Sequence, residues 1–264
     1  MSMSTASGQA RPITNFASII DMESVSKSNY NALVLQIQRR MTKGLSGQAN
    51  YTWSKATDYN QQFGTFAASF MNVNDPLNPA LDRGPSSNNI PHKFVGSAVW
   101  IPATTFNMAK SGLAHAIFGD LQLSPIVVIS SGYAINSSIP TTFPPSFSTP
   151  SNSLTGAGGL LTVPLARNIH NRPYTFTTDL RVSKRIHFTE HMSLELLAEG
   201  FNIFNRSNIT QVNTSYISSI NFGATSALGV LTYNPDFGKT TTTGINNTII
   251  FSPRQIQLGA RFHF

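Results

Sequence analysis

Two glutamates and two arginines are spaced so that they could form either a catalytic carboxylate pair or a set of ion pairs. Glu195 and Glu199 fall on one face of a predicted strand, and paired carboxylates are the groups that glycoside hydrolases use. If the surrounding segment is a hairpin centred on Glu190, however, Arg185 lies opposite Glu195 and Arg181 lies opposite Glu199. We therefore predict two cross-strand charge pairs that face the interior of a barrel, and no carboxylate dyad.

Other patterns that could support catalysis or metal binding are incomplete. Ser24 to Lys27 matches Ser-x-x-Lys, but the companion motifs of that enzyme class are absent. The glycines of 156–159 lack the Lys-Ser/Thr of a phosphate-binding loop. The histidines have no metal-ligand spacing; they are His92, His115, His170, His187, His191 and His263. We expect no catalytic residue, no cofactor, no metal site and no enzyme activity.

The formal net charge of +7 raises the question of nucleic-acid binding. Basic residues are spread from Arg11 to Arg261, and the densest group is Arg39 and Arg40 with Lys43. Because no recognised nucleic-acid motif accompanies them, we expect no nucleic-acid partner.

The clearest structural element is a hairpin with strands near 30–41 and 45–56. Pairing about Lys43, in a three-residue turn of 42–44, places Leu35 opposite Tyr51 and Ile37 opposite Ala49. The opposite face then collects amide side chains, namely Gln36, Gln38, Gln48 and Asn50. We predict that the apolar face, with Leu33, meets lipid and that the amide face lines a lumen.

Five more strands are predicted near 92–101, 121–131, 175–188, 192–205 and 253–264. The hairpin of 175–205 has one apolar face, in which Lys184 is the exception and is long enough to reach an interface. Connections alternate between short or intermediate segments and long ones rich in Asn, Ser, Thr, Gly and Pro, and they require no helix.

Composition supports a membrane barrel. Charged residues make up 11% of the 264 residues, and no apolar run is long enough for a membrane helix. The predicted fold is all-β: an antiparallel up-and-down meander of about seven long strands, the C-terminal part of a transmembrane β-barrel with short periplasmic turns and long extracellular loops. A soluble β-sandwich with long loops is the alternative.

With these elements placed, the chain resembles the C-terminal part of a TonB-dependent outer-membrane receptor of the Oar-like group, in which a carboxypeptidase-regulatory-like domain and a plug precede the barrel. The resemblance rests on "RPITNFASIIDMESVSKSNYNALVLQIQRRMTKGLSGQANYTWSKATD", "NPALDRGPSSNNIPHKFVGSAVWIP", "TDLRVSKRIHFTEHMSLELLAEGFNIFNRSN" and the final "SPRQIQLGARFHF". It implies a barrel of about 22 strands, to which residues 1–264 contribute the last seven.

The resemblance also assigns roles to particular residues. Leu258, Phe262 and the terminal Phe264 are similar to the signal that the barrel-assembly machinery reads in outer-membrane proteins. Aromatic residues near strand ends fit an interfacial girdle; they are Tyr51, Trp53, Trp100 and Phe204.

These features imply a fragment of a receptor in the bacterial outer membrane. Its expected partners are membrane lipid, the barrel-assembly machinery, and the N-terminal barrel strands and plug that have no counterpart here; TonB is reached only through those missing parts. The first residues lack a secretory signal, so we expect the natural beginning to be missing. The alternatives are a surface adhesion or structural module that binds through its long loops, and a secreted carbohydrate-binding β-sandwich.

Overall fold

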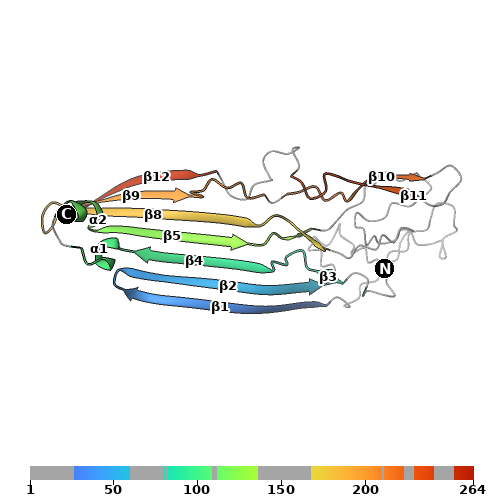
Figure 1. Cartoon of the computed structure of the whole chain (residues 1–264), viewed down its shortest axis with the longest axis horizontal. Coiled ribbons are helices and arrows are strands. Elements are labelled where there is room, and N and C mark those ends of the chain that lie inside the picture. Colours follow the sequence, from blue (N-terminus) through green and yellow to red (C-terminus); the bar gives the residue numbers. More distant parts are fainter. Residues whose placement is uncertain are drawn as a thin grey trace, which may run out of the picture.

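A computed structural model describes residues 27–59, 80, 83–108, 112–135, 168–209, 211–222, 229–240 and 253–264. Seven long strands form one antiparallel sheet in the order β1-β2-β4-β5-β8-β9-β12, and the short β3 (Gly84–Pro85) pairs with the end of β2 (Figure 1). The long strands are β1 (Ser28–Thr42), β2 (Leu45–Asp58), β4 (His92–Trp100), β5 (Leu121–Ser130), β8 (Thr175–His187), β9 (Ser193–Phe201) and β12 (Gln255–His263). The predicted all-β meander is confirmed.

The β1–β2 hairpin has the predicted register. Leu35 is opposite Tyr51 and Ile37 is opposite Ala49, which keeps apolar residues on one face and amides on the other. The turn is tighter than predicted: Lys43 and Gly44 alone connect the strands, and both have positive φ (50° and 74°). A register shift between Arg39 and Thr42 absorbs the difference.

The second hairpin, β8–β9, also has the predicted register, because Arg181 is opposite Glu199 and Arg185 is opposite Glu195. Its connection is wider than the predicted three residues, since β8 ends at His187 and β9 begins at Ser193. The Thr189 hydroxyl accepts a hydrogen bond from the backbone N–H of Met192 (3.0 Å), which stabilises this turn.

Helices occur at the end of the sheet where the β1–β2 turn lies, contrary to the expectation of none. They are α1 (Pro102–Thr105) and α2 (Leu113–Phe118), both between β4 and β5. Pro102 occupies the first turn of α1, where its missing N–H costs nothing, and it also terminates the preceding strand pairing. The C-terminus of the chain lies at this same end (Figure 1).

The long connections at the opposite end also contain secondary structure that was predicted as loop. β6 (Ala134–Ile135) pairs with β7 (His170–Asn171), and β10 (Ile217–Phe222) pairs with β11 (Gly229–Tyr233). Figure 1 places β10 and β11 far from α1 and α2. β6 and β7 are distant in sequence, so alternation within one segment does not encode their pairing.

The buried apolar side chains among the described residues belong to these connections and not to the long sheet strands. They are Ala134, Ile135, Val212 and Ile217. An aromatic cluster accompanies them, in which the ring of His170 lies 5.0 Å from that of Phe237 and the ring of Tyr216 lies 5.1 Å from that of Tyr233.

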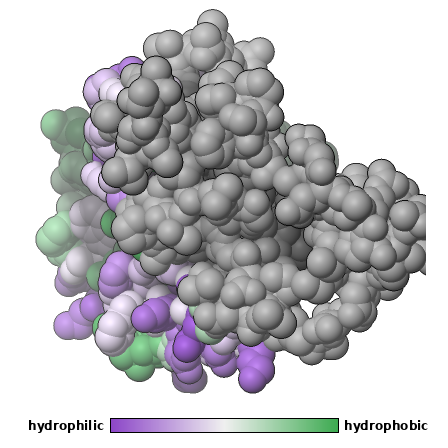
Figure 2. Space-filling view, turned by 90° about the vertical axis from the view of Figure 1, so that its right-hand side faces the viewer, coloured by the Kyte–Doolittle hydropathy of each residue, from purple (hydrophilic) through white to green (hydrophobic). Residues whose placement is uncertain are grey.

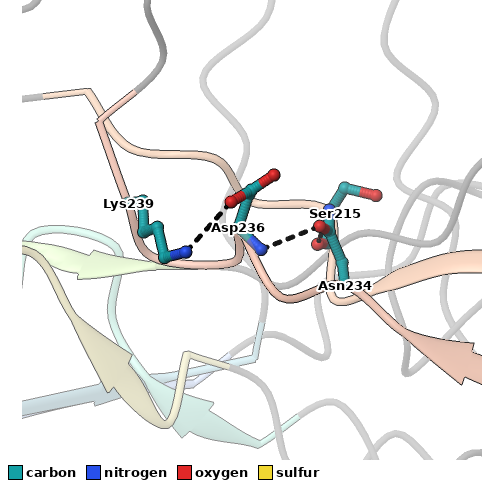
Figure 3. A network of polar contacts seen from close by, with 4 residues as sticks. All are labelled: Ser215, Asn234, Asp236 and Lys239. Carbon is teal, nitrogen blue, oxygen red and sulfur yellow. Dashed lines mark hydrogen bonds and ion pairs between the residues drawn. The ribbon is translucent and has the colours of Figure 1, made fainter.

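A polar network closes the turn after β11 (Figure 3). The Asn234 side chain accepts a hydrogen bond from the N–H of Asp236 (3.0 Å) and donates one to the carbonyl of Ser215 (2.9 Å). Lys239 donates to the Asp236 carboxylate at 3.1 Å. The end of the molecule that carries the long connections is therefore partly packed and hydrogen-bonded.

Candidate functional site: a sheet with an apolar and a polar face

The apolar face of the sheet extends across all seven long strands, and Lys184 is a charged exception on it. Strand register aligns Leu35, Tyr51 and Phe94 in one row, and Val182, Ala198 and Leu258 in another. Many of these side chains are well exposed, with Ile37 at 74% and Leu258 at 82%. Figure 2 shows hydrophobic residues along the left margin of the coloured part of the molecule, with hydrophilic residues to their right. An exposed apolar surface of this extent marks an interaction with lipid or with another protein.

The predicted girdle residues lie toward both ends of this face. Trp100 is opposite Leu45 next to the β1–β2 turn, whereas Trp53 is opposite His92 near the far end. From position 45 to position 53 the strand rises about 26 Å, close to the apolar band of about 25 Å in outer-membrane barrels. Phe204 follows β9 at the far end and stacks on Phe176 at 5.9 Å.

Lys184 lies on the apolar face and reaches the end of the sheet, as its length suggested. Its ammonium group donates to the carbonyl of Ile117 (3.3 Å) and to that of Gly119 at the C-terminus of α2. A cation there satisfies carbonyls that the helix leaves without partners. The charge is thereby removed from the middle of the apolar face.

The opposite face is polar, and its charge is unevenly distributed. Amide and hydroxyl side chains of β1, β2, β4 and β5 surround a shallow hollow, which Gln38, Gln48, Ser97, Ser124 and Ile126 help to line. Charged positions concentrate on the other strands; they are Asp179, Arg181, Arg185, Glu195, Glu199 and Arg261. Val34 and Ile126 are exposed apolar exceptions on this face.

One predicted charge pair forms and the other is replaced. Arg181 Nε lies 3.4 Å from Glu199 Oε1. The Glu195 carboxylate instead contacts Arg261 Nη1 and His263 Nε2 of β12, each at 3.5 Å, and no ion pair with Arg185 occurs among the described residues. Glu195 lies between β8 and β12 in the sheet, so both strands offer it a cation. Arg261 and His263 share this face of β12 because they alternate with Ala260 and Phe262, which lie on the apolar face.

Of the three predicted assembly-signal residues, Leu258 and Phe262 belong to β12 at the edge of the sheet, and Phe264 follows directly after this strand. Leu258 and Phe262 lie on the apolar face opposite Ala198 and Leu194, and the ring of Phe262 stacks on that of Phe264 at 6.3 Å. Phe264 is 97% exposed. Their recognition by the assembly machinery stays a prediction.

Sequence reasoning missed the residues that brace the far end of the strands. Asn208, which is fully buried, accepts from the N–H of Phe176 (2.8 Å) and donates to its carbonyl (3.0 Å). The Asp179 carboxylate accepts from the N–H of Asn202 (2.9 Å), and the Tyr51 hydroxyl bonds His92 Nδ1 (2.8 Å). Asparagine-rich segments after strands signal turns, but they do not reveal which strand each side chain contacts.

No group of metal-ligating side chains gathers in the part of the chain that the structure describes. None of the helices found there is long and apolar enough to cross a membrane. The first three residues of the Ser24–Lys27 pattern and the glycines of 156–159 lie outside the described residues.

The two-faced meander can be compared with known proteins. The family model described as outer membrane beta barrel domain matches residues 1–158 and 140–257, which together span nearly the whole chain. The chain belongs to this family. No curated protein and no solved structure matches it. As a member of the outer membrane beta barrel domain family, the protein is located in the bacterial outer membrane.

Proposed function

We propose that the chain is part of a receptor-type barrel whose apolar face meets lipid and whose polar face lines the lumen. The observation that supports this proposal is the strand register, which gathers most apolar residues of the long strands on one face and most polar residues on the other, with exceptions such as Val34, Ile126 and Lys184. In hydrocarbon, each exposed amide or charge would cost several kcal/mol, so the reverse orientation is strongly disfavoured.

Closure of this barrel requires further strands. The edge strands β1 and β12 run in the same direction in the antiparallel meander. Joining them directly would create a parallel seam, and a second copy of the seven strands related by rotation about the barrel axis would also meet β12 in parallel. An odd number of additional strands removes the mismatch and gives the even count usual in single-chain bacterial barrels.

We propose that the complete protein binds an extracellular ligand and takes it up with energy transmitted by TonB. Support comes from the resemblance to TonB-dependent receptors, in which a plug and the earlier strands accompany such a C-terminal barrel part. The polar face of β1, β2, β4 and β5 would offer the ligand mainly amide and hydroxyl groups along its path, and Arg39 also lines the hollow on this face.

The test combines assembly with partner capture. The chain is expressed with a signal peptide, alone and together with the upstream barrel strands and plug, and outer membranes are analysed for a heat-modifiable, protease-resistant barrel. The purified barrel is then mixed with the periplasmic domain of TonB. Capture that requires the plug supports the receptor function, whereas a complete barrel that never binds TonB would contradict it.

A surface adhesion module is the second candidate. The packed connections around β6, β7, β10 and β11 favour it, because an ordered surface at one end of a barrel suits protein binding. Loss of cell attachment on deletion of β10 and β11, with uptake unchanged, would support this role. A secreted β-sandwich requires a second sheet over the apolar face, and the described strands provide none. Extraction of the protein into buffer without detergent would support this alternative.

A further inference from the structure

The tip of the β1–β2 hairpin is strongly basic. Arg39, Arg40 and Lys43 are all exposed, and residues 28–57 contain no aspartate or glutamate. The nearest acids described at this end belong to other elements: Asp120 lies 3.7 Å from His187, and Glu190 is in the β8–β9 turn. The hairpin tip therefore carries three cations, and the one acidic residue of β1 and β2, Asp58, lies at the opposite end of the hairpin.

Helix α1 is docked on this basic tip. The N–H of Ile101 donates to the carbonyl of Gly44 (2.7 Å), and the Thr105 hydroxyl donates to that of Lys43 (2.9 Å). Trp100 Nε1 in turn donates to the Thr105 hydroxyl (2.9 Å). These bonds fix the basic turn and the connection that follows β4 in one unit.

The same unit presents apolar side chains that nothing covers among the described residues. Phe106 is 63% exposed and packs edge-on against Trp100 at 6.2 Å, while Leu113 of α2 is 79% exposed. Ile117 and Phe118 are also exposed. Through Trp100, this patch continues into the apolar face of the sheet.

We propose that the β1–β2 turn together with α1 and α2 forms a binding rim for anionic phospholipid headgroups. This proposal rests on the proposed contact of the apolar face with lipid, because the rim is continuous with that face. Apolar side chains would enter the boundary between acyl chains and headgroups. Arg39, Arg40 and Lys43 lie at the end of the hairpin, where the register shifts after Arg39, and would reach the phosphates around the end of the sheet. Flexible cationic side chains at such a boundary keep their charge in the headgroup layer while their stems cover apolar surface.

The test uses the assembled barrel with its completing strands, purified from outer membranes in non-ionic detergent. The chain has no cysteine, so Leu113→Cys provides a single labelling site for an environment-sensitive fluorophore. The label is titrated with mixed micelles that contain phosphatidylglycerol or phosphatidylcholine. If the rim binds anionic headgroups, the fluorescence change should saturate at a lower micellar content of phosphatidylglycerol than of phosphatidylcholine. The emission should also shift to the blue.

The decisive variant is Arg39→Gln/Arg40→Gln/Lys43→Gln. Each cation contributes about fivefold to association with an anionic surface, so the triple variant should bind phosphatidylglycerol about a hundredfold more weakly. The matched control, Lys55→Gln/Lys93→Gln, removes cations from the opposite end of β2 and β4 and should leave the titration unchanged. Heat-modifiability of each variant verifies that the barrel is intact.

An intact barrel that binds both lipids equally, or whose triple variant matches the parent, would overturn the rim alone. Failure to obtain any heat-modifiable barrel would overturn the proposed function and the rim together, so the two failures are distinguishable.

Discussion

At the scale of single residues, Ile37 and Gln38 are neighbours that point to opposite faces of β1. We expect Ile37→Arg to destabilise the complete barrel by about 2 to 4 kcal/mol, because a guanidinium near mid-membrane is desolvated. Gln38→Arg should change stability little, since its face is polar. Urea unfolding in vesicles measures both, and equal tolerance of the two substitutions would contradict the assignment of faces.

The charged residues of β8, β9 and β12 give a second prediction. Double-mutant cycles should yield a coupling of about 0.2 to 1 kcal/mol for Glu195 with Arg261 and for Glu199 with Arg181, because both pairs are partly solvated. The double-mutant cycle of Glu195 with Arg185 should give almost no coupling free energy. The two couplings should also weaken in concentrated salt, and a larger coupling of Glu195 to Arg185 would contradict the observed geometry.

At the scale of elements, the docking of α1 depends on Gly44. Gly44 has φ of 74°, and a Cβ there would lie 2.6 Å from the carbonyl oxygen of Ile101. Gly44→Ala should therefore destabilise the barrel by more than the roughly 1 to 2 kcal/mol of left-handed backbone strain. Gly238 also has a positive φ (75°), but open space surrounds it, so Gly238→Ala measures the backbone strain without a steric clash. Gly259→Ala introduces neither effect and should be tolerated. Equal losses at Gly44 and Gly238 would show that the docking contact is unimportant.

The far end of β8 depends on Asn208. Asn208→Ala removes two hydrogen bonds to the backbone of Phe176 and leaves its partly buried N–H and carbonyl without this partner, at about 1 to 3 kcal/mol each. The variant should then be cut near 205–209 at a lower protease concentration than the parent protein. The exposed Asn29→Ala serves as the control, and identical protease profiles of the two variants would contradict the bracing role.

At the scale of the whole molecule, the two edges of the sheet control assembly. β1 and β12 each have one long neighbour among the described strands, which leaves a row of backbone groups without sheet partners. Residues 1–264 expressed alone with a signal peptide should aggregate, because hydrocarbon cannot satisfy those groups. Addition of the upstream strands should restore a heat-modifiable barrel, and a stable barrel from the chain alone would contradict this prediction.

The sequence by itself determined the seven long strands, their order in the sheet and the pairing within the two hairpins. A strand exposes alternate residues to opposite faces, so Leu35, Ile37 and Gln38 report their sides directly, and a short turn fixes the partner of each residue. The register about Lys43 and about Glu190 followed from these local rules alone.

The tertiary structure decided what depends on neighbours that are distant in sequence. Glu195 contacts Arg261 and His263 because β12 returns beside β9, a competition that the β8–β9 hairpin does not reveal. Helix α1 forms where the carbonyls of Lys43 and Gly44 in the β1–β2 turn accept hydrogen bonds from Thr105 and Ile101. In each case the deciding free energy comes from non-local contacts, which the alternation of one segment does not contain.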